Sequence, residues 1–307
     1  MINDTVLQSL GKTDTIEVNT LKLRYFLTKD TTSPLMIILP GVTEPIEKYS
    51  HVIEKLVTKG FSVACLDWPD QGLSSRYLSD TTARYSLGFD KEVAAFTAFY
   101  KHLQTLISPT STHILAHSMG AHLTLRALLS NTEIEPDTVL LSAPLIDLYF
   151  ASKAESIISR LIIKTACLCG LSREFPPGLG EWSPQQFDKT KEKFCSHPIR
   201  KDLLKTIYTR HPDLTSGGIT FGWLGEALRS IDWLRHHKAR LNRLNMPMHV
   251  FIAEQDIVVD NQSIKHFLKD AVTVKIHSLP DSYHEILMEP DELQKPVWDV
   301  IDSLAAN

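Results

Sequence analysis

Short runs of consecutive apolar residues alternate along most of the chain with longer stretches in which apolar residues recur every three or four positions. The longer stretches predict amphipathic helices, and the short runs predict strands that are buried on both faces of a sheet. Polarity alternates residue by residue over 14–27, which predicts an N-terminal β-hairpin. The strands are expected at 35–39, 61–67, 112–118, 137–144, 248–256 and 272–279, with helices at 46–59, 90–107, 122–130, 261–269 and 290–304.

Buried strands that alternate with helices specify an α/β fold, in which helices cover both faces of a mostly parallel sheet. The alternation breaks once, over residues 145–238, where helical patterns at 154–170 and 224–234 follow without a strand between them. We therefore expect residues 1–144 and 239–307 to form one α/β domain. Residues 145–238 are expected to form an inserted helical cap at one edge of its strands.

The composition narrows the classes of protein to which this chain can belong. Its 307 residues are 43% hydrophobic and 22% charged, which excludes a mostly disordered chain. The net charge of -4 lacks the basic excess of a nucleic-acid-binding protein, so no nucleic-acid partner is expected. No signal peptide or membrane-spanning run is apparent, and the four cysteines are too few and scattered for a disulfide framework. We expect a cytoplasmic protein with reduced, packed thiols.

The most informative short segment is the sequence Ala-His-Ser-Met-Gly at 116–120, between a predicted strand and a predicted helix. A nucleophilic serine needs exposure at the carboxyl end of a sheet and a base within reach of its hydroxyl. A sharp strand–turn–helix elbow gives the exposure, and it requires small residues two positions before and after the serine. Ala116 and Gly120 meet that requirement, so Ser118 is the candidate nucleophile. The alternative is that Ser118 merely caps the helix.

A serine nucleophile also needs a base and a carboxylate that orients the base, and in this type of fold they follow in the order serine, acid, histidine. Asp256 follows the strand at 248–256 and His284 follows the last strand, so both are expected at the carboxyl edge of the sheet. Two rivals exist. Asp260 is expected to cap the helix that begins at Asn261, and His277 is expected to be an ordinary strand side chain.

Acyl transfer further requires hydrogen-bond donors for the negative oxygen that develops in the transition state. One expected donor is the backbone N–H of Met119, the residue after the candidate nucleophile. The other is the backbone N–H of Val42, because Gly41 permits the chain after the strand at 35–39 to turn an N–H inward. The alternative is an ordinary glycine turn.

Five segments, in this order, resemble the α/β-hydrolases of the lysophospholipase and monoacylglycerol lipase group, also called serine aminopeptidase S33-like hydrolases. Two residues depart from that family's pattern. Pro40 replaces a usual histidine, and Asp70 stands where a glycine is usual, which predicts a left-handed backbone position. The matching segments are PGVTEPIEKY at 40–49, LDWPDQGLSSR at 66–76, LAHSMGAHLTLRAL at 115–128, EQDIVVDN at 254–261 and YHEILMEPDE at 283–292.

The resemblance implies a serine hydrolase that cleaves the ester of a lysophospholipid or a monoacylglycerol through an acyl-enzyme. The alternatives are a small-ester or thioester hydrolase, an S33-type aminopeptidase and, more remotely, a non-catalytic binding protein. No metal or organic cofactor is implied, because the histidines lack partners at ligand spacing. The oligomeric state is left open. Some of the cap's aromatic residues are candidates for the lining of an acyl-chain tunnel, and the alternative is that most of them form the cap's own core; the set is Tyr149, Phe150, Phe175, Trp182, Phe187, Phe194, Phe221, Trp223 and Trp233.

The predicted cap helix at 154–170 is amphipathic and carries basic residues on its polar side. Lys153, Arg160 and Lys164 are spaced by seven and four positions, so they share one face. Such a helix can rest on an anionic lipid surface, which predicts a transient peripheral contact with the inner membrane surface. The alternative is that its apolar residues pack on the main domain and its basic face is simply solvated. Those apolar residues are Ile157, Ile158, Leu161 and Ile162.

Overall fold

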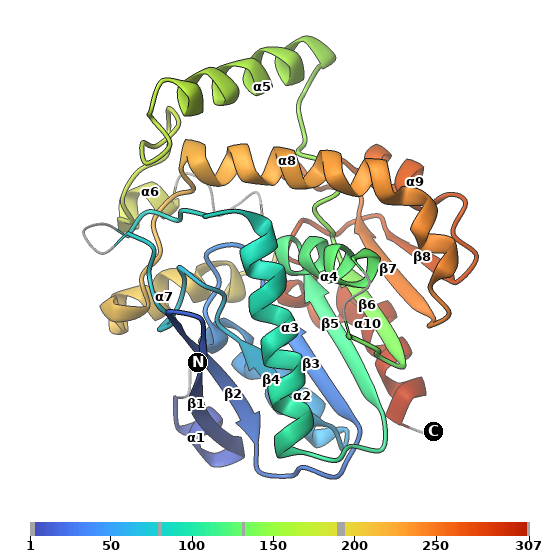
Figure 1. The fold of residues 1–307 in the computed structure, drawn as a ribbon. Helices are drawn as coiled ribbons and strands as arrows, with labels where there is room; N and C mark the ends of the chain where they lie inside the picture. The colour runs from blue at the N-terminus through green and yellow to red at the C-terminus, as the bar shows by residue number, and fades with distance from the viewer. Residues whose placement is uncertain (1–3, 79–81, 131–132, 189–193, 306–307) are drawn as a thin grey trace.

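The computed structural model describes residues 4–78, 82–130, 133–188 and 194–305, and these contain one sheet of eight strands (Figure 1). The strand order is β1-β2-β4-β3-β5-β6-β7-β8. β1 pairs antiparallel with β2 and β2 antiparallel with β4, whereas the six strands from β4 to β8 pair in parallel. The strands are β1 (Gly11–Val18), β2 (Leu21–Thr28), β3 (Leu35–Leu39), β4 (Ser62–Leu66), β5 (Thr112–His117), β6 (Thr138–Ser142), β7 (Met248–Ala253) and β8 (Val274–Leu279).

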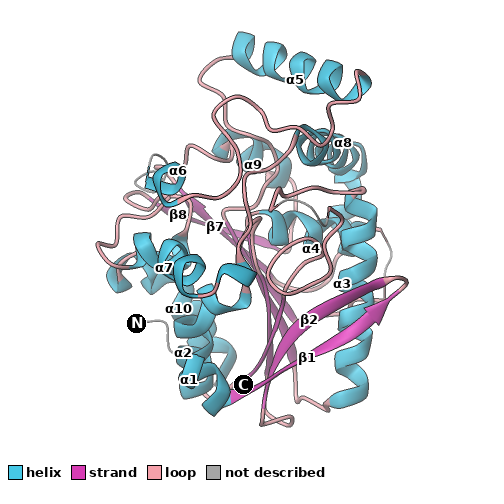
Figure 2. Ribbon diagram, turned by 90° about the vertical axis from the view of Figure 1, so that its left-hand side faces the viewer, coloured by secondary structure: helices cyan, strands magenta, loops and turns pink. Residues whose placement is uncertain are grey.

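Helices cover both faces of this sheet, as the apolar runs predict. Figure 2 shows α3 on one side of the strands and α2 and α10 on the other. β3, β4 and β6 are buried at every position, which is what coverage on two sides requires. The helices of this part of the chain are α1 (Asp4–Leu10), α2 (Ser50–Thr58), α3 (Phe89–Leu106), α4 (Met119–Leu129), α9 (Asn261–Leu268) and α10 (Asp291–Ala305).

The structure differs from the predicted elements at three places. The turn at Ile46–Tyr49 is a 3-10 helix that leads into α2. α4 begins at Met119 rather than at residue 122, because the chain reverses sharply at Ser118. The short helix α1 was not predicted, since its seven residues carry too little periodicity to distinguish it from a loop. Gly60 follows α2 with a φ of 89°, which confirms it as the left-handed residue that ends this helix.

The chain between β6 and β7 is helical and lies across the carboxyl ends of the strands (Figure 1). Two isolated β-bridges connect this region to the main body, Arg84 with Ile219 and Leu148 with Val259. The boundaries 145 and 238 of a cap domain stay a prediction. The helices here are α5 (Lys153–Leu168), α6 (Pro184–Asp188), α7 (Leu203–Arg210) and α8 (Phe221–His237), with 3-10 turns at Arg200–Asp202, Pro212–Leu214 and Lys238–Arg243.

The loop after β4 is tied together by buried carboxylates. Asp67 accepts the Nε–H of Arg24 at 2.6 Å and the backbone N–H of Ile46 at 2.9 Å, so it connects three segments. Asp70 has a φ of 69°, which confirms that the residue replacing the family's glycine lies in the left-handed region. Its side chain compensates by accepting the backbone N–H groups of Tyr77 and Tyr85.

The turn from β5 into α4 is a tight elbow. Ser118 lies at its tip with φ 49° and ψ -112°, a conformation that L-residues rarely adopt. A Cβ atom at Gly120 would lie 2.2 Å from the carbonyl oxygen of Leu39 and 2.5 Å from that of Pro40. The absence of a side chain at Gly120 therefore allows α4 to begin directly against the end of β3.

We expect Gly120→Ala to lower the free energy of unfolding by about 3 kcal/mol, because the added methyl group displaces backbone and not a flexible side chain. Urea unfolding monitored by circular dichroism measures this change. Gly180→Ala is the matched control, since no atom lies within 4 Å of the Cβ added there. Equal losses in the two variants would contradict the close contact at Gly120.

Candidate active site

The structure brings together the three side chains that the sequence singles out at the carboxyl edge of the sheet. Ser118 Oγ lies 2.9 Å from Nε2 of His284, and Nδ1 of His284 lies 2.6 Å from Oδ2 of Asp256. Ser118 follows β5, Asp256 follows β7, and His284 follows β8. The imidazole thus contacts the hydroxyl with one nitrogen and the carboxylate with the other, so the hydroxyl proton has an acceptor within hydrogen-bond distance.

The surroundings keep Asp256 ionised and make His284 a stronger base. Burial opposes the ionisation of Asp256, but His284 and the backbone N–H groups of Val258 and Val259 hold the pKa of this carboxyl below its ordinary value. Burial also lowers the pKa of His284, yet the neighbouring Asp256, and then Glu285 and Glu44, raise it above the ordinary value for histidine. The carboxylate therefore stabilises the imidazolium that forms when His284 takes a proton.

A second buried cluster borders this triad, and the sequence reasoning did not find it. Lys48 Nζ lies 2.6 Å from Glu44 and 2.7 Å from Glu285, the residue after the triad histidine. Glu44 also accepts the hydroxyl of Tyr49 at 2.7 Å and the N–H of Gly41 at 2.5 Å. One buried lysine thus pairs with two carboxylates. The sequence signals for Glu44 and Lys48 were their i,i+4 spacing and their place in the family-like segment at 40–49.

His117, the residue before the serine, packs against the triad without taking part in it. Its ring lies 4.8 Å from the His284 ring, centroid to centroid. Burial lowers the pKa of His117 to about 4, so this ring is neutral near pH 7. His117 therefore adds a polar wall next to His284 without adding a competing charge.

The two expected backbone donors have no acceptor within the described part of the protein: neither the N–H of Val42 nor that of Met119 donates there. The conformational reason given for Val42 needs correction. Thr43, with a φ of 61°, is the left-handed residue of this loop, and Gly41 is not. Gly41 is needed for space, since a Cβ there would lie 2.8 Å from Glu44 Oε2 and 3.0 Å from the His117 ring.

A cavity of about 300 Å³ opens above Ser118, between the main sheet and the segment that follows β6. Of the nine aromatic residues considered for a tunnel, Trp182, Phe187 and Phe194 line this cavity, and Tyr208 joins them. Trp223 instead packs in the core against Phe89. Three cationic residues also lie in the cavity wall: Lys48, which pairs with Glu44 and Glu285, and Arg200 and Lys201. The cavity is thus mainly apolar, with positive charge from Arg200 and Lys201 in its wall.

The rival residues have other roles. Asp260 caps α9 by accepting the backbone N–H of Gln262, as predicted. His277 lies in β8 beside His249, with ring nitrogens 3.0 Å apart.

In the described ranges no group of three or more potential metal ligands occurs, and no helix is long and apolar enough to cross a membrane. Of the four thiols, Cys169 is exposed, so the expectation that all are packed is wrong for that residue.

The parallel sheet, the elbow and the Ser–His–Asp contacts define a serine hydrolase of the α/β-hydrolase fold. Comparison with known families agrees: residues 30–291 match the model of the family described as serine aminopeptidase, S33. The chain belongs to this family, and it is a serine ester hydrolase.

Individual relatives are more distant. The chain is 25% identical over 263 residues to a probable lysophospholipase L2 of Haemophilus influenzae, covering 86% of this chain and 80% of the relative. It is 26% identical over 271 residues to lysophospholipase L2 of Escherichia coli K12, covering 85% and 76%. A soluble variant of the monoglyceride lipase of Saccharomyces cerevisiae has the same fold, with a TM-score of 0.75, 13% identity and coverage of 99% and 96%.

We expect Glu285→Gln to lower the pKa of His284, because it removes one of the negative charges that favour the imidazolium. An NMR titration of the imidazole signals measures that pKa directly. If neutral His284 is the base, the acid limb of the kcat/KM profile moves to lower pH with it. The exposed Glu292→Gln removes the same charge elsewhere and serves as the control. An unchanged His284 titration in Glu285→Gln would contradict the electrostatic argument.

Proposed function

We propose that this enzyme hydrolyses the carboxylic ester of lipids that carry a single acyl chain, through an acyl-enzyme formed on Ser118. The observation that carries the proposal is the position of Ser118, hydrogen-bonded to His284, in the wall of a largely apolar cavity with aromatic side chains. We take residues 145–238 as the cap that supplies most of those aromatic residues. An apolar cavity next to a nucleophile suits a substrate whose acyl chain is buried while its ester is attacked.

In the proposed mechanism His284 accepts the proton of Ser118 as the serine oxygen attacks the ester carbonyl carbon. The N–H groups of Val42 and Met119 donate to the oxygen that becomes negative, and Asp256 stabilises the imidazolium. His284 then gives its proton to the leaving alcohol, and the acyl group stays on the serine. A water molecule releases the fatty acid in a second round of the same proton transfers.

The polar side of the cavity favours a phosphate-bearing head group, so we favour lysophospholipids over monoacylglycerols. Lys201 lies in the cavity wall, and in the described part of the chain its ammonium group has no carboxylate partner. Arg200 lies beside it, although Asp291 and the carbonyl of Glu289 already accept two of its donors. Two cations at one wall suit an anionic head group, and a neutral glycerol head group would not use them.

The aminopeptidase alternative is less well supported by the same cavity. A peptidase that removes N-terminal residues needs a free carboxylate to hold the substrate amine. Glu44 and Glu285 are the carboxylates among the described lining residues, and Lys48 pairs with both. An incoming ammonium group would therefore have to displace a buried lysine.

We further propose that α5 contacts the lipid surface from which the substrate comes. Figures 1 and 2 show α5 at the outside of the molecule, with α8 between it and the main body. The alternative, that its apolar residues pack on the main domain, is wrong: Ile157 is 68% exposed and Leu161 62%. The buried residues of α5 are Ile163 and Ala166. Exposed apolar side chains grouped on one helix are typical of an interaction surface.

The charges on α5 fit an anionic lipid surface, with one correction to the sequence argument. Arg160 is not free for a lipid contact, because its guanidinium pairs with Asp147. Lys153 and Lys164 remain exposed at either end of the helix. Each such cation contributes about 1 kcal/mol near an anionic membrane, and the exposed isoleucine and leucine side chains supply the larger apolar contribution.

A hydrolysis panel tests the proposed substrate class. The panel contains lysophospholipids, monoacylglycerols, short p-nitrophenyl esters and aminoacyl amides, and we expect the highest kcat/KM on lysophospholipids. A preference for aminoacyl amides would overturn the proposal in favour of the peptidase alternative. Lys201→Ala is expected to lower kcat/KM on lysophospholipids while leaving that on monoacylglycerols unchanged.

We expect Ser118→Ala, His284→Ala and Asp256→Asn each to lower kcat by about 10⁴-fold while the fold is retained. A fluorophosphonate probe followed by peptide mapping should label Ser118 in the wild-type protein. Asp260→Asn is the matched control for the acid, because this neighbouring carboxylate caps α9 and does not contact His284. Labelling of another serine, or equal losses at Asp256 and Asp260, would overturn the assignment.

We expect the inactive Ser118→Ala protein to co-sediment with phosphatidylcholine vesicles that contain phosphatidylglycerol. Ile157→Ser with Leu161→Ser should weaken this binding by about 10-fold or more, because two large apolar contacts are lost. Val272→Ser with Ile276→Ser is the control, since it removes exposed apolar side chains just before and within the edge strand β8, outside α5. Equal binding by the two double variants, or binding that ignores anionic lipid, would exclude α5 as the contact.

A further inference from the structure

One buried glutamine side chain holds the loop that carries Val42. Gln71 Nε2 donates to the carbonyl of Gly41 at 2.9 Å and to that of Glu44 at 3.1 Å. Gln71 Oε1 accepts the backbone N–H of Thr43 at 3.1 Å. These three peptide groups lie on both sides of Val42, and Gln71 is fully buried. A single amide therefore fixes the direction of the chain before and after the Val42 N–H.

Arg84 determines which way that amide points. Arg84 Nε donates to Gln71 Oε1 at 3.1 Å, and a guanidinium group has donors but no acceptor. The amide atom that faces Arg84 must therefore be the oxygen, which turns the NH₂ group toward the two loop carbonyls. If the amide were rotated by 180°, its NH₂ group would face the donors of Arg84 and Thr43, and its oxygen would face two carbonyls.

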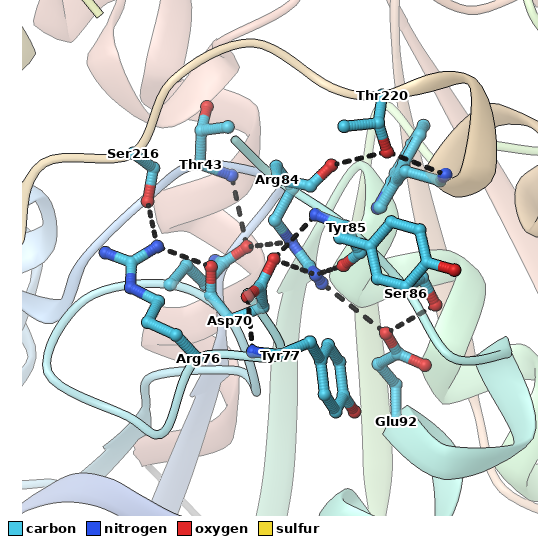
Figure 3. Close-up of polar contacts among 12 residues, drawn as sticks. Thr43, Asp70, Arg76, Tyr77, Arg84, Tyr85, Ser86, Glu92, Ser216 and Thr220 are labelled. Atoms are coloured by element: carbon cyan, nitrogen blue, oxygen red, sulfur yellow. Dashed lines mark hydrogen bonds and ion pairs between the residues drawn. The ribbon is translucent and has the colours of Figure 1, made fainter. Parts of the chain in front are cut away.

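Arg84 is itself surrounded by polar partners, and Figure 3 shows these contacts. It is fully buried, and its guanidinium lies 3.4 Å from Asp70 and 3.5 Å from Glu92, both also fully buried. Its Nη2 lies 3.9 Å from the sulfur of Met119. The same guanidinium therefore contacts the side chain of one expected oxyanion donor and, through Gln71, orients the loop of the other.

We infer that Gln71, oriented by Arg84, is the positioning residue that aims the Val42 N–H at the developing oxyanion. The inference rests on the proposed acyl-enzyme mechanism but not on the identity of the lipid. Other contacts also restrain this loop: Glu44 accepts the Gly41 N–H, and the Tyr208 hydroxyl donates to the Thr43 carbonyl at 2.6 Å. Only Gln71 contacts the peptide groups on both sides of Val42 among the described residues.

The inference predicts that a Gln71 variant stabilises the transition state less well but binds the intact substrate as the wild type does. Without the Gln71 amide, the carbonyl of Gly41 and the N–H of Thr43 lose the partner they share, and the Val42 N–H between them moves away from the reacting oxygen. Complete loss of one such donor lowers kcat by about 10²- to 10³-fold, so a misplaced donor should cost about 10- to 100-fold. Because the Gln71 side chain is fully buried behind the loop, affinity for the intact substrate should change little.

The experiment compares Gln71→Met with wild type on p-nitrophenyl butyrate and with an alkyl trifluoromethyl ketone, which binds a serine as a tetrahedral adduct with a negative oxygen. We expect kcat/KM to fall by about 10- to 100-fold and the Ki of the ketone to rise by the same factor. The Ki of a non-hydrolysable ether lipid should stay within about two-fold. Gln71→Asn keeps the amide but shortens its reach. If Gln71→Met does not fold, the same kcat/KM and ketone Ki are measured on Gln71→Asn.

Gln294→Met is the matched control. Gln294 is equally buried and makes two hydrogen bonds, to Glu289 and Trp298, but it lies in α10 away from this loop. It should lose stability while keeping the ketone Ki of the wild type. A folded Gln71 variant whose ketone Ki stays within about two-fold of wild type would overturn the inference, whatever its kcat. If wild type cleaves the short ester but no lysophospholipid, the proposed substrate class fails while this test still applies.

Discussion

The close contact between the start of α4 and the end of β3 is the constraint on which the site depends. Gly120 lies directly against the carbonyl groups of Leu39 and Pro40, and a side chain there would collide with backbone. The contact brings the elbow that carries Ser118 next to the loop that begins at Gly41. This contact places the Val42 N–H, on the loop after β3, near the elbow that carries Ser118 and the Met119 N–H.

Some of the charge in this protein is buried in small groups in which one cation lies between two carboxylates. Lys48 pairs with Glu44 and Glu285 beside the triad, and Arg84 pairs with Asp70 and Glu92. Replacing the cation of either group by a neutral side chain would leave two carboxylates unpaired in a medium that solvates charge poorly. The arrangement lets several ionised side chains lie close to His284 while Asp256 remains the one carboxylate that is hydrogen-bonded to its ring.

Much of the fold was predictable from the sequence, because short continuous apolar runs such as 35–39 are typical of a strand that is covered on two sides. The elbow at 116–120 and the order of Ser118, Asp256 and His284 likewise follow from local pattern and chain order. The role of Gln71 did not follow, since its contacts with Gly41 and Arg84 join segments far apart in sequence. The exposure of Ile157 was also unpredictable, because periodicity shows that a helix has an apolar face but not whether anything covers it.

The outward face of α5 has a consequence for how the chain can vary. Side chains such as Ile157 and Leu168, at 68% and 78% exposed, bury little apolar area in the folded monomer and so add little to its stability. Substitutions there therefore change the free energy of unfolding little, unlike substitutions at Ile163 on the covered side. Related enzymes could exchange this face to match surfaces of different composition while the sheet and the triad beneath it stay unchanged.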